Sequence, residues 1–295
     1  MACKSDDCFL LHLLLHSIIM SIHKILITHA RPHFDDVLAM WLLQKFHPDF
    51  TKAEIAFTDE KPPVIPEGAT AIGIGRGQFD EHKGDEGECA ATLVWKWLKI
   101  QPELTFSARE TMALERILDW ALQEDLGQLN NATWREMSVV VPVENYWTVA
   151  KGDNQAVYQL ASQILEAMLV YQLGLAHLEE EWANRIEFTS PWGKAIAIET
   201  SAGGVSQRAY QEGNALIVQI DPTTGARQFR ADATSKVDLS EIYDVLGKRE
   251  PDASWFLHHG KKLLLCGSRT APKFVPSKLT LEQMIELVTK TADKK

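Results

Sequence analysis

Imidazole and carboxylate side chains gather near the start of the chain. Four of them fall close together, directly after the apolar run KILIT: His29, His33, Asp35 and Asp36. A short apolar run of this kind predicts a buried strand. In open α/β sheets ligands bind at the carboxyl ends of strands, because loops converge there beside helix N-termini. Imidazole and carboxylate together suit Mn, Zn or Fe, so this loop is a candidate metal site.

A second polar cluster follows a later predicted strand. It starts with Asp80, Glu81 and His82, and the same loop continues with Asp85, Glu86 and Glu88. One such loop by itself is more often a solvated turn. Two loops at equivalent strand ends, however, could bring about five or six ligands into one cleft, enough for one or two cations.

The elements that must position these clusters alternate between strands and helices. Apolar runs predict strands at 24–30, 53–58 and 69–75, and helical spacing predicts helices at 37–46, 89–100, 107–126 and 156–182. Ser107 and Glu110 form a capping box at the start of one of these helices. The alternation predicts an α/β fold with a parallel sheet in the N-terminal domain.

Beyond Ile186 the apolar residues alternate instead, which predicts a smaller C-terminal α/β domain. The turn DPTTG separates two strands of an antiparallel hairpin, a further strand pair turns at Gly260, and a helix follows Thr280. We expect a leader or mis-started extension at 1–19, a metal-binding domain at 20–150, a connecting helix at 151–185 and a substrate-binding domain at 186–295. The metal cleft is expected between the two domains.

Composition and charge set limits on function. The chain has 295 residues, of which 45% are hydrophobic and 24% charged, as in ordinary globular proteins. Its formal net charge of -10 argues against broad, non-specific attraction to nucleic acid. The four cysteines form no CxxC pair, so neither a disulfide framework nor a thiolate zinc site is indicated.

One N-terminal stretch resembles a membrane segment. The apolar run FLLHLLLHSIIM is too short for the ~20 residues that span a bilayer as a helix. It also contains two histidines, and no small-residue cleavage site follows it. We therefore expect no membrane association and a cytoplasmic protein.

The other motifs that we considered do not predict a function. GIGRG at 73–77 lacks the full GxGxxG spacing and leads into an acidic loop, so it does not predict a dinucleotide site. Neither a GxSxG elbow, a P-loop nor an HExxH motif occurs.

The stretches THARPHFDDVLAMWLL and AIGIGRGQFDEHK resemble the first and third motifs of the DHH phosphoesterase superfamily. The closest branch contains the metal-dependent hydrolases or RNA exonucleases of the melanocyte-proliferating-gene family. The resemblance implies a parallel-sheet DHH-like domain, a smaller α/β domain and a phosphohydrolase activity that depends on Mn or Zn, with Mg as a further option.

The resemblance also implies roles for individual residues. The implied metal ligands are His29, His33, Asp35, Asp80, His82 and Asp119, with Asp125 as a weaker candidate for the last. His82 or His33 would orient the nucleophile or protonate the leaving group. The residues implied to face substrate phosphate are His258, His259, Gly260, Gly267 and Arg269.

Two positions depart from the family pattern. Glu81 stands where the triplet has its middle His, and Gly73 stands where a carboxylate is expected to bridge two metals. Without that carboxylate two neighbouring cations would lose the shared anion that offsets their repulsion. A single ion held by His29, His33, Asp35 and Asp80 would fit this change.

Two functions remain open from the sequence. The first is a metal-dependent phosphohydrolase whose substrate is a small phosphorylated molecule, a nucleotide or a short oligonucleotide. The second is a DHH-like binding or regulatory module whose catalytic centre has decayed. A homodimer is compatible with either function.

Overall fold

The computed structural model describes residues 24–84, 87–129, 139–268 and 273–292. The predicted leader at 1–19 and the predicted substrate residue Arg269 lie outside these ranges. The chain divides into two compact units, Met1–Val170 and Tyr171–Lys295, and each is described by itself.

The first unit is built on a parallel sheet with the strand order β2-β1-β3. The central strand β1 (Ile25–His29) pairs with β2 (Glu54–Thr58) and with β3 (Ala69–Ala71). All three strands point the same way, so their carboxyl ends share one edge, and His29 ends β1 there. The strand predicted over 69–75 is too long: it stops at Ala71, because Gly73 turns the chain with a φ of +64° after a single bridge between Ile72 and Phe79.

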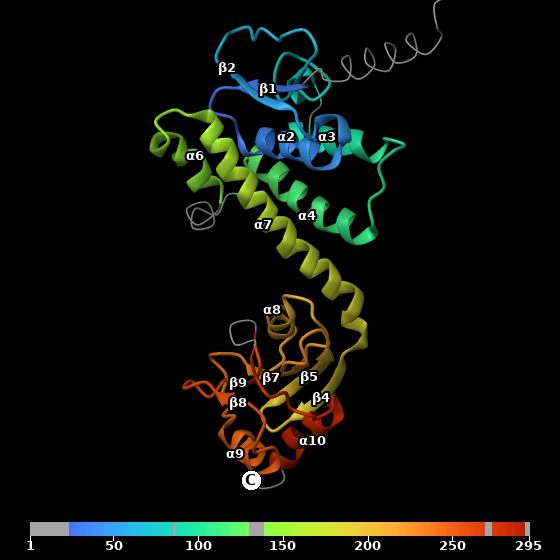
Figure 1. Ribbon diagram of the computed structural model, residues 1–295, viewed down its shortest axis with the longest axis vertical. Helices are drawn as coiled ribbons and strands as arrows, with labels where there is room; N and C mark the ends of the chain where they lie inside the picture. Colours follow the sequence, from blue (N-terminus) through green and yellow to red (C-terminus); the bar gives the residue numbers. More distant parts are fainter. Residues whose placement is uncertain (1–23, 85–86, 130–138, 269–272, 293–295) are drawn as a thin grey trace, which may run out of the picture. The chain divides into compact units, whose positions relative to one another are not determined.

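The helices of this unit gather on one side of the sheet (Figure 1). They are α2 (Phe34–Phe46), α3 (Ala90–Lys99), α4 (Ala108–Asp125), α6 (Val140–Val149) and the first part of α7 (Asn154–Glu181), with short 3-10 turns η1 (Pro48–Phe50) and η2 (Glu81–Lys83). Helix α2 packs against α3, α4 and α6. The predicted capping box of α4 is confirmed, since Ser107 and Glu110 bond each other's backbone N–H.

The start of α2 corrects the sequence prediction. The helix was expected from Val37, but it begins at Phe34 with His33 as its N-cap. Asp36 stabilises this earlier start, because its Oδ2 accepts the backbone N–H of His33 at 3.0 Å. Asp35 and Asp36 therefore belong to the first helical turn, and both are buried.

The second unit contains a mixed sheet in the order β4-β5-β6-β7-β9-β8. Its strands are β4 (Ile186–Ser190), β5 (Gly193–Glu199), β6 (Leu216–Ile220), β7 (Arg227–Ala231), β8 (Trp255–Leu257) and β9 (Leu263–Cys266). The predicted hairpin is confirmed by the antiparallel pair β6–β7, and the predicted strand pair by β8–β9.

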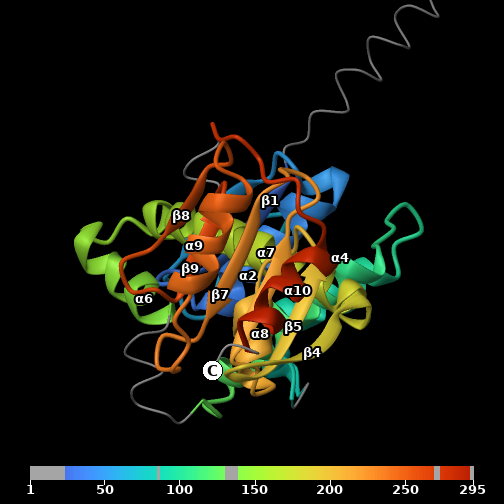
Figure 2. The ribbon, with the colours of Figure 1, turned by 90° about the horizontal axis from the view of Figure 1, so that it is seen from below.

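Helices cover both faces of this sheet. On one face α9 (Ser240–Arg249) and α10 (Leu281–Ala292) pack over a core that includes Phe229 and Met284, and Figure 2 shows the two helices lying across the strands. On the other face α8 (Val205–Gln211) packs with Trp182, which belongs to the turn η3 (Trp182–Asn184). The predicted closing helix after Thr280 is confirmed by α10.

Across the residues with described positions, no helix combines the length and the apolar character that a membrane crossing requires.

Candidate metal site

His29 is positioned with one ring nitrogen turned into the site. It ends β1, and its Nδ1 donates to the carbonyl oxygen of the next residue, Ala30, at 2.8 Å. Its Nε2 then faces Asp36, 3.0 Å from the Oδ2 of that carboxylate. Histidines that bind metals commonly hold their other ring N–H on a backbone carbonyl in this way. His29 is therefore oriented as a metal ligand would be.

Asp36 occupies the space beside Gly73, the position where the sequence resemblance led us to expect a bridging carboxylate. Its Oδ1 lies 2.0 Å from where a Cβ on Gly73 would sit, so no side chain fits at position 73 beside it. The carboxylate missing from the sequence at Gly73 is thus replaced in space by one from the first turn of α2. Asp36 was part of the first cluster in the sequence but was not among the predicted ligands.

Asp35 is a deeply buried carboxylate. Only 4% of the residue is exposed, and one oxygen accepts the backbone N–H of Ala90 at 3.2 Å. Burial raises the pKa of Asp35 well above its ordinary value, and the nearby carboxylates of Asp36, Asp125 and Glu81 raise it further. A cation would offset both effects, since it favours the charged form.

The residues of the segment Asp80–His82 have two different roles: one holds its neighbour in place, and the other two line the cavity. Asp80 is buried and accepts hydrogen bonds from the backbone N–H of Arg76 at 2.6 Å and from that of His82 at 3.0 Å. It also accepts from His82 Nδ1 at 2.9 Å, which leaves His82 Nε2 free and raises the pKa of His82. Glu81 and His82 line the cavity, whereas Asp80, predicted as a ligand, does not line it but has an oxygen close to the ligand atoms of these two residues.

Of the two candidate ligands on α4, Asp125 lines the cavity and Asp119 does not. Asp119 lies on the exposed side of α4, where its carboxylate accepts a hydrogen bond from Gln123 at 2.7 Å, and it lines none of the described cavities at the site. Asp125, at the end of α4, lines the cavity together with His33 and Asp35. The structure therefore favours the weaker of the two sequence candidates.

One cavity of about 640 Å³ is lined by the imidazoles and carboxylates described above, namely His29, His33, Asp35, Asp36, Glu81, His82 and Asp125. Two groups of ligand atoms, each within 4.8 Å of one another, share His33: one adds His29 and Asp36, and the other adds Asp35 and Asp125. A third group, Asp80, Glu81 and His82, comes from the second loop. The two loops of the sequence prediction do meet at one edge of the sheet.

The charges of the cavity suit a divalent cation. The residues that line it include five carboxylates, Asp35, Asp36, Glu81, Glu88 and Asp125, and neither lysine nor arginine. Only Glu88 of these has a described lysine partner, Lys96. The Oε2 of Glu81 is buried and has no hydrogen-bond partner among the described residues. Crowded, buried carboxylates next to imidazoles are the ligand set of Mn²⁺ and related ions.

The pKa of His29 predicts that metal binding releases protons. The hydrogen bond to Asp36 raises that pKa to about 9, so the ring is protonated at pH 7 and must lose its proton to bind a cation. We expect the Mn²⁺ association constant to rise about tenfold per pH unit between pH 7 and pH 9. Calorimetry in buffers of different ionisation enthalpy would count the protons. His29→Gln should release about one proton fewer, and an unchanged count would contradict this assignment.

The same pKa shift has an opposite consequence for the metal-free protein. Because the pKa of His29 is raised in the folded protein, the His29–Asp36 pair stabilises the fold fully at pH values below 6.5, the ordinary pKa of histidine. That contribution is lost as the pH rises through about 9.

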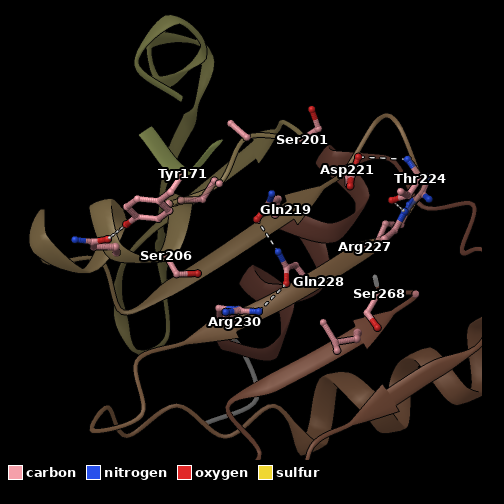
Figure 3. Close-up of a pocket in the computed structure, with 18 residues that line it drawn as sticks. Tyr171, Ser201, Ser206, Gln219, Asp221, Thr224, Arg227, Gln228, Arg230 and Ser268 are labelled. Carbon is pink, nitrogen blue, oxygen red and sulfur yellow. Dashed lines mark hydrogen bonds between the residues drawn. The ribbon is translucent and has the colours of Figure 1, made fainter. Parts of the chain in front are cut away.

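The second unit carries a separate polar cavity of about 560 Å³ (Figure 3). Across its sheet, Gln228 Nε2 donates to Gln219 Oε1 at 2.6 Å, and Arg230 donates to Gln228 Oε1 at 3.3 Å. Arg227 is held by the carbonyl oxygens of Leu279 and Gly225. The sequence reasoning missed both arginines, because the alternation of β7 indicates only which residues share a face.

Of the predicted substrate residues, Gly267 alone lines this cavity among those the structure describes. At Gly267 φ is +87°, and a Cβ there would lie 2.4 Å from the ring of Phe274, so only glycine fits. His258 and His259 lie instead next to each other after β8, with ring centroids 4.0 Å apart, and Gly260 donates its N–H to His258 Nδ1.

Comparisons with known proteins give structural matches only. No protein-family model and no curated protein matches this chain. Among solved structures, RecJ from Thermus thermophilus in complex with Mg²⁺ matches 96% of this chain with 14% identity and a TM-score of 0.34, and its Mn²⁺ complex matches 96% with 12% identity and the same score. This chain covers 52% and 54% of those two chains, about half of their length.

A third structure, the DHH domain of a member of the s1p family of ribosomal proteins, matches 95% of this chain with 11% identity and a TM-score of 0.34, and 88% of that chain is covered.

Proposed function

We propose that this protein is a metal-dependent phosphohydrolase. The observation that carries the proposal is the cavity at the carboxyl edge of the first sheet, where buried carboxylates and oriented imidazoles meet without a lysine or arginine among the lining residues. A bound divalent cation polarises a phosphoryl oxygen and lowers the pKa of a coordinated water, which is the chemistry that phosphate ester hydrolysis needs.

We assign the cation to the imidazoles of His29 and His33 and the carboxylates of Asp35, Asp36 and Asp125. The ligand set is rich in carboxylate oxygen and offers no thiolate, because burial raises the pKa of the neighbouring Cys89 to about 12. Mn²⁺ fits such a mixture of oxygen and nitrogen ligands better than a soft metal does.

His82 is the best-placed proton donor. Its Nδ1 is held by Asp80, its side chain is largely exposed, and the hydrogen bond raises its pKa, which favours the protonated ring. An exposed imidazolium beside the cavity can protonate a leaving oxygen. His33 is also exposed, and it stands next to the ligand carboxylates, which favours a ligand role for it.

The alternative, a binding module with a decayed centre, was suggested by Gly73 and Glu81. The carboxylate of Asp36 beside Gly73 counts against decay, because Asp36 supplies the negative charge that position 73 lacks. For the substrate we propose a small phosphorylated molecule, a nucleotide or a short oligonucleotide. Taken by itself, the cavity of the second unit has two cationic side chains, Arg227 and Arg230, which suit a phosphate group.

Hydrolysis of bis-p-nitrophenyl phosphate, a generic phosphodiester, tests the proposal. We expect turnover that depends on added Mn²⁺ and that falls at least about a hundredfold in Asp35→Asn. Asp119→Asn is the matched control: it changes an exposed acid of α4 that bonds only Gln123 among described residues, and it should keep full activity. Activity in Asp35→Asn equal to that of the unchanged protein would refute the proposal.

A further inference from the structure

Arg31 adopts a backbone conformation that arginine rarely takes. Its φ is +59°, in the left-handed region where a side chain other than glycine is strained. Non-glycine residues in this region persist only where the surroundings hold them, and they concentrate at binding sites. Arg31 stands in the turn between His29 and His33, the two imidazoles of the metal site.

Two contacts from the helical part of the same unit hold Arg31 in place. Its backbone N–H donates to Oδ1 of Asn154, the first residue of α7, at 2.8 Å. Its guanidinium lies over the ring of Trp147 of α6, with 4.1 Å between Cζ and the ring centroid. Gly152 allows the other part of that ring a close approach, since a Cβ there would be 3.3 Å from it. The guanidinium is therefore fixed by stacking, and no residue that the structure describes accepts a hydrogen bond from its N–H donors.

A cavity of about 420 Å³ lies beside this pair. Arg31 and Trp147 line it, and so do His29 and His33, which also line the metal cavity. The two cavities therefore adjoin at the imidazoles. Glu144 lines the smaller cavity too, but no described carboxylate forms an ion pair with Arg31. Arg31 is therefore an exposed cation, and the metal cavity next to it is lined by several carboxylates.

We propose that Arg31 is a substrate-binding residue that takes the non-bridging oxygens of a phosphate ester at the metal cavity. The cavity beside Trp147 receives the organic group esterified to that phosphate. A planar guanidinium offers paired N–H donors to phosphate oxygens, and stacking on an aromatic ring leaves these donors free. This inference rests on the proposed function, whose substrate class it narrows to esters with a group that fits beside an aromatic ring.

A purely structural role for Arg31 makes a different prediction. If the residue served only to hold the turn, glycine would be the better choice at φ +59°. Arg31→Gly relieves the strain while it removes the cation, so the two roles separate in one variant. Lys151→Gly is the matched control, because Lys151 is also basic, has a φ of +53° and lines neither cavity.

The test is calorimetric binding of phenylphosphonate, a non-hydrolysable analogue of a phosphate monoester, to the full chain saturated with Mn²⁺. We expect Arg31→Gly to weaken phenylphosphonate binding at least about tenfold and to leave the Mn²⁺ affinity within about twofold of the unchanged protein. The phenylphosphonate affinity of Arg31→Lys should fall between those of Arg31→Gly and the unchanged protein. Lys151→Gly should bind phenylphosphonate as tightly as the unchanged protein does.

Three results would overturn the inference: no phenylphosphonate binding by the unchanged protein, undiminished binding by Arg31→Gly, or a parallel loss of Mn²⁺ and phenylphosphonate affinity in that variant. Failure of the proposed function looks different. Phenylphosphonate binding that depends on Arg31, in a protein that hydrolyses no phosphodiester, would refute hydrolysis and leave this inference standing.

Discussion

Replacing Asp36 with asparagine is expected to weaken Mn²⁺ binding at least about a hundredfold, because the variant loses a buried anionic ligand. The carboxylate of Asp36 bonds His29 Nε2 at 3.0 Å and fills the space beside Gly73. Asparagine keeps an oxygen that can accept the N–H of His33, so the start of α2 should survive. Titration of Mn²⁺ by calorimetry measures the loss.

The stability of the variant separates loss of a ligand from loss of the helix start. Asp36→Asn loses the ion pair with His29 but keeps an oxygen that can accept the N–H of His33. Asp36→Ala loses both and should be about 0.5–2 kcal/mol less stable than Asp36→Asn, because alanine cannot cap α2. Mn²⁺ affinity in Asp36→Asn equal to that of the unchanged protein would show that Asp36 serves the helix alone.

Moving the carboxylate from position 36 to position 73 gives the second large effect. Gly73→Asp alone should disrupt the site, because its Cβ would lie 2.0 Å from Asp36 Oδ1, and Mn²⁺ affinity should fall at least about a hundredfold. In the double variant Asp36→Gly, Gly73→Asp the obstructing carboxylate is gone. The new one enters the same space, and aspartate is among the residues that tolerate a φ near +64°.

We therefore expect the double variant to bind Mn²⁺ at least about tenfold more tightly than either single variant, a non-additive result that reports direct coupling of two positions. Asp36→Gly by itself is the necessary comparison, since this variant opens the space beside Gly73 but places no carboxylate in it. Losses that simply add in the double variant would mean that positions 36 and 73 do not share one carboxylate site.

Much of the fold could be predicted from local patterns. The hairpin β6–β7 follows from alternation on both sides of a DPTTG turn, and α4 follows from its capping box and apolar spacing. Both signals are local, because a turn and a cap act on residues close in sequence. The third strand was predicted four residues too long, since the chain turns at Gly73 with a φ of +64°, in a place beside Asp36 of another element.

The candidate site shows the same limit. His29, His33, Asp35 and His82 could be predicted as cavity residues because they follow strands in sequence. Asp119 and Asp125 could not be separated by pattern alone: they are six positions apart on α4, about 1.7 turns, and so point in different directions. Asp36 was missed because its direction depends on where α2 begins, and that start is set by its own bond to His33.

Arg31 is the residue that sequence reasoning had least chance to find. Its neighbours in the turn gave no sign of a positive φ, which usually points to glycine or asparagine. The contacts that hold it come from Trp147 and Asn154, more than a hundred positions away. Only the tertiary structure brings these residues together.

Binding of a divalent cation in the cavity can be measured as the metal content of the protein itself. Equilibrium dialysis against Mn²⁺, followed by elemental analysis, should find at least about one ion per unchanged chain and almost none in a folded Asp35→Ala variant. A folded, unchanged chain that retains no Mn²⁺, Zn²⁺ or Mg²⁺, or an Asp35→Ala chain that retains as much as the unchanged one, would contradict the account.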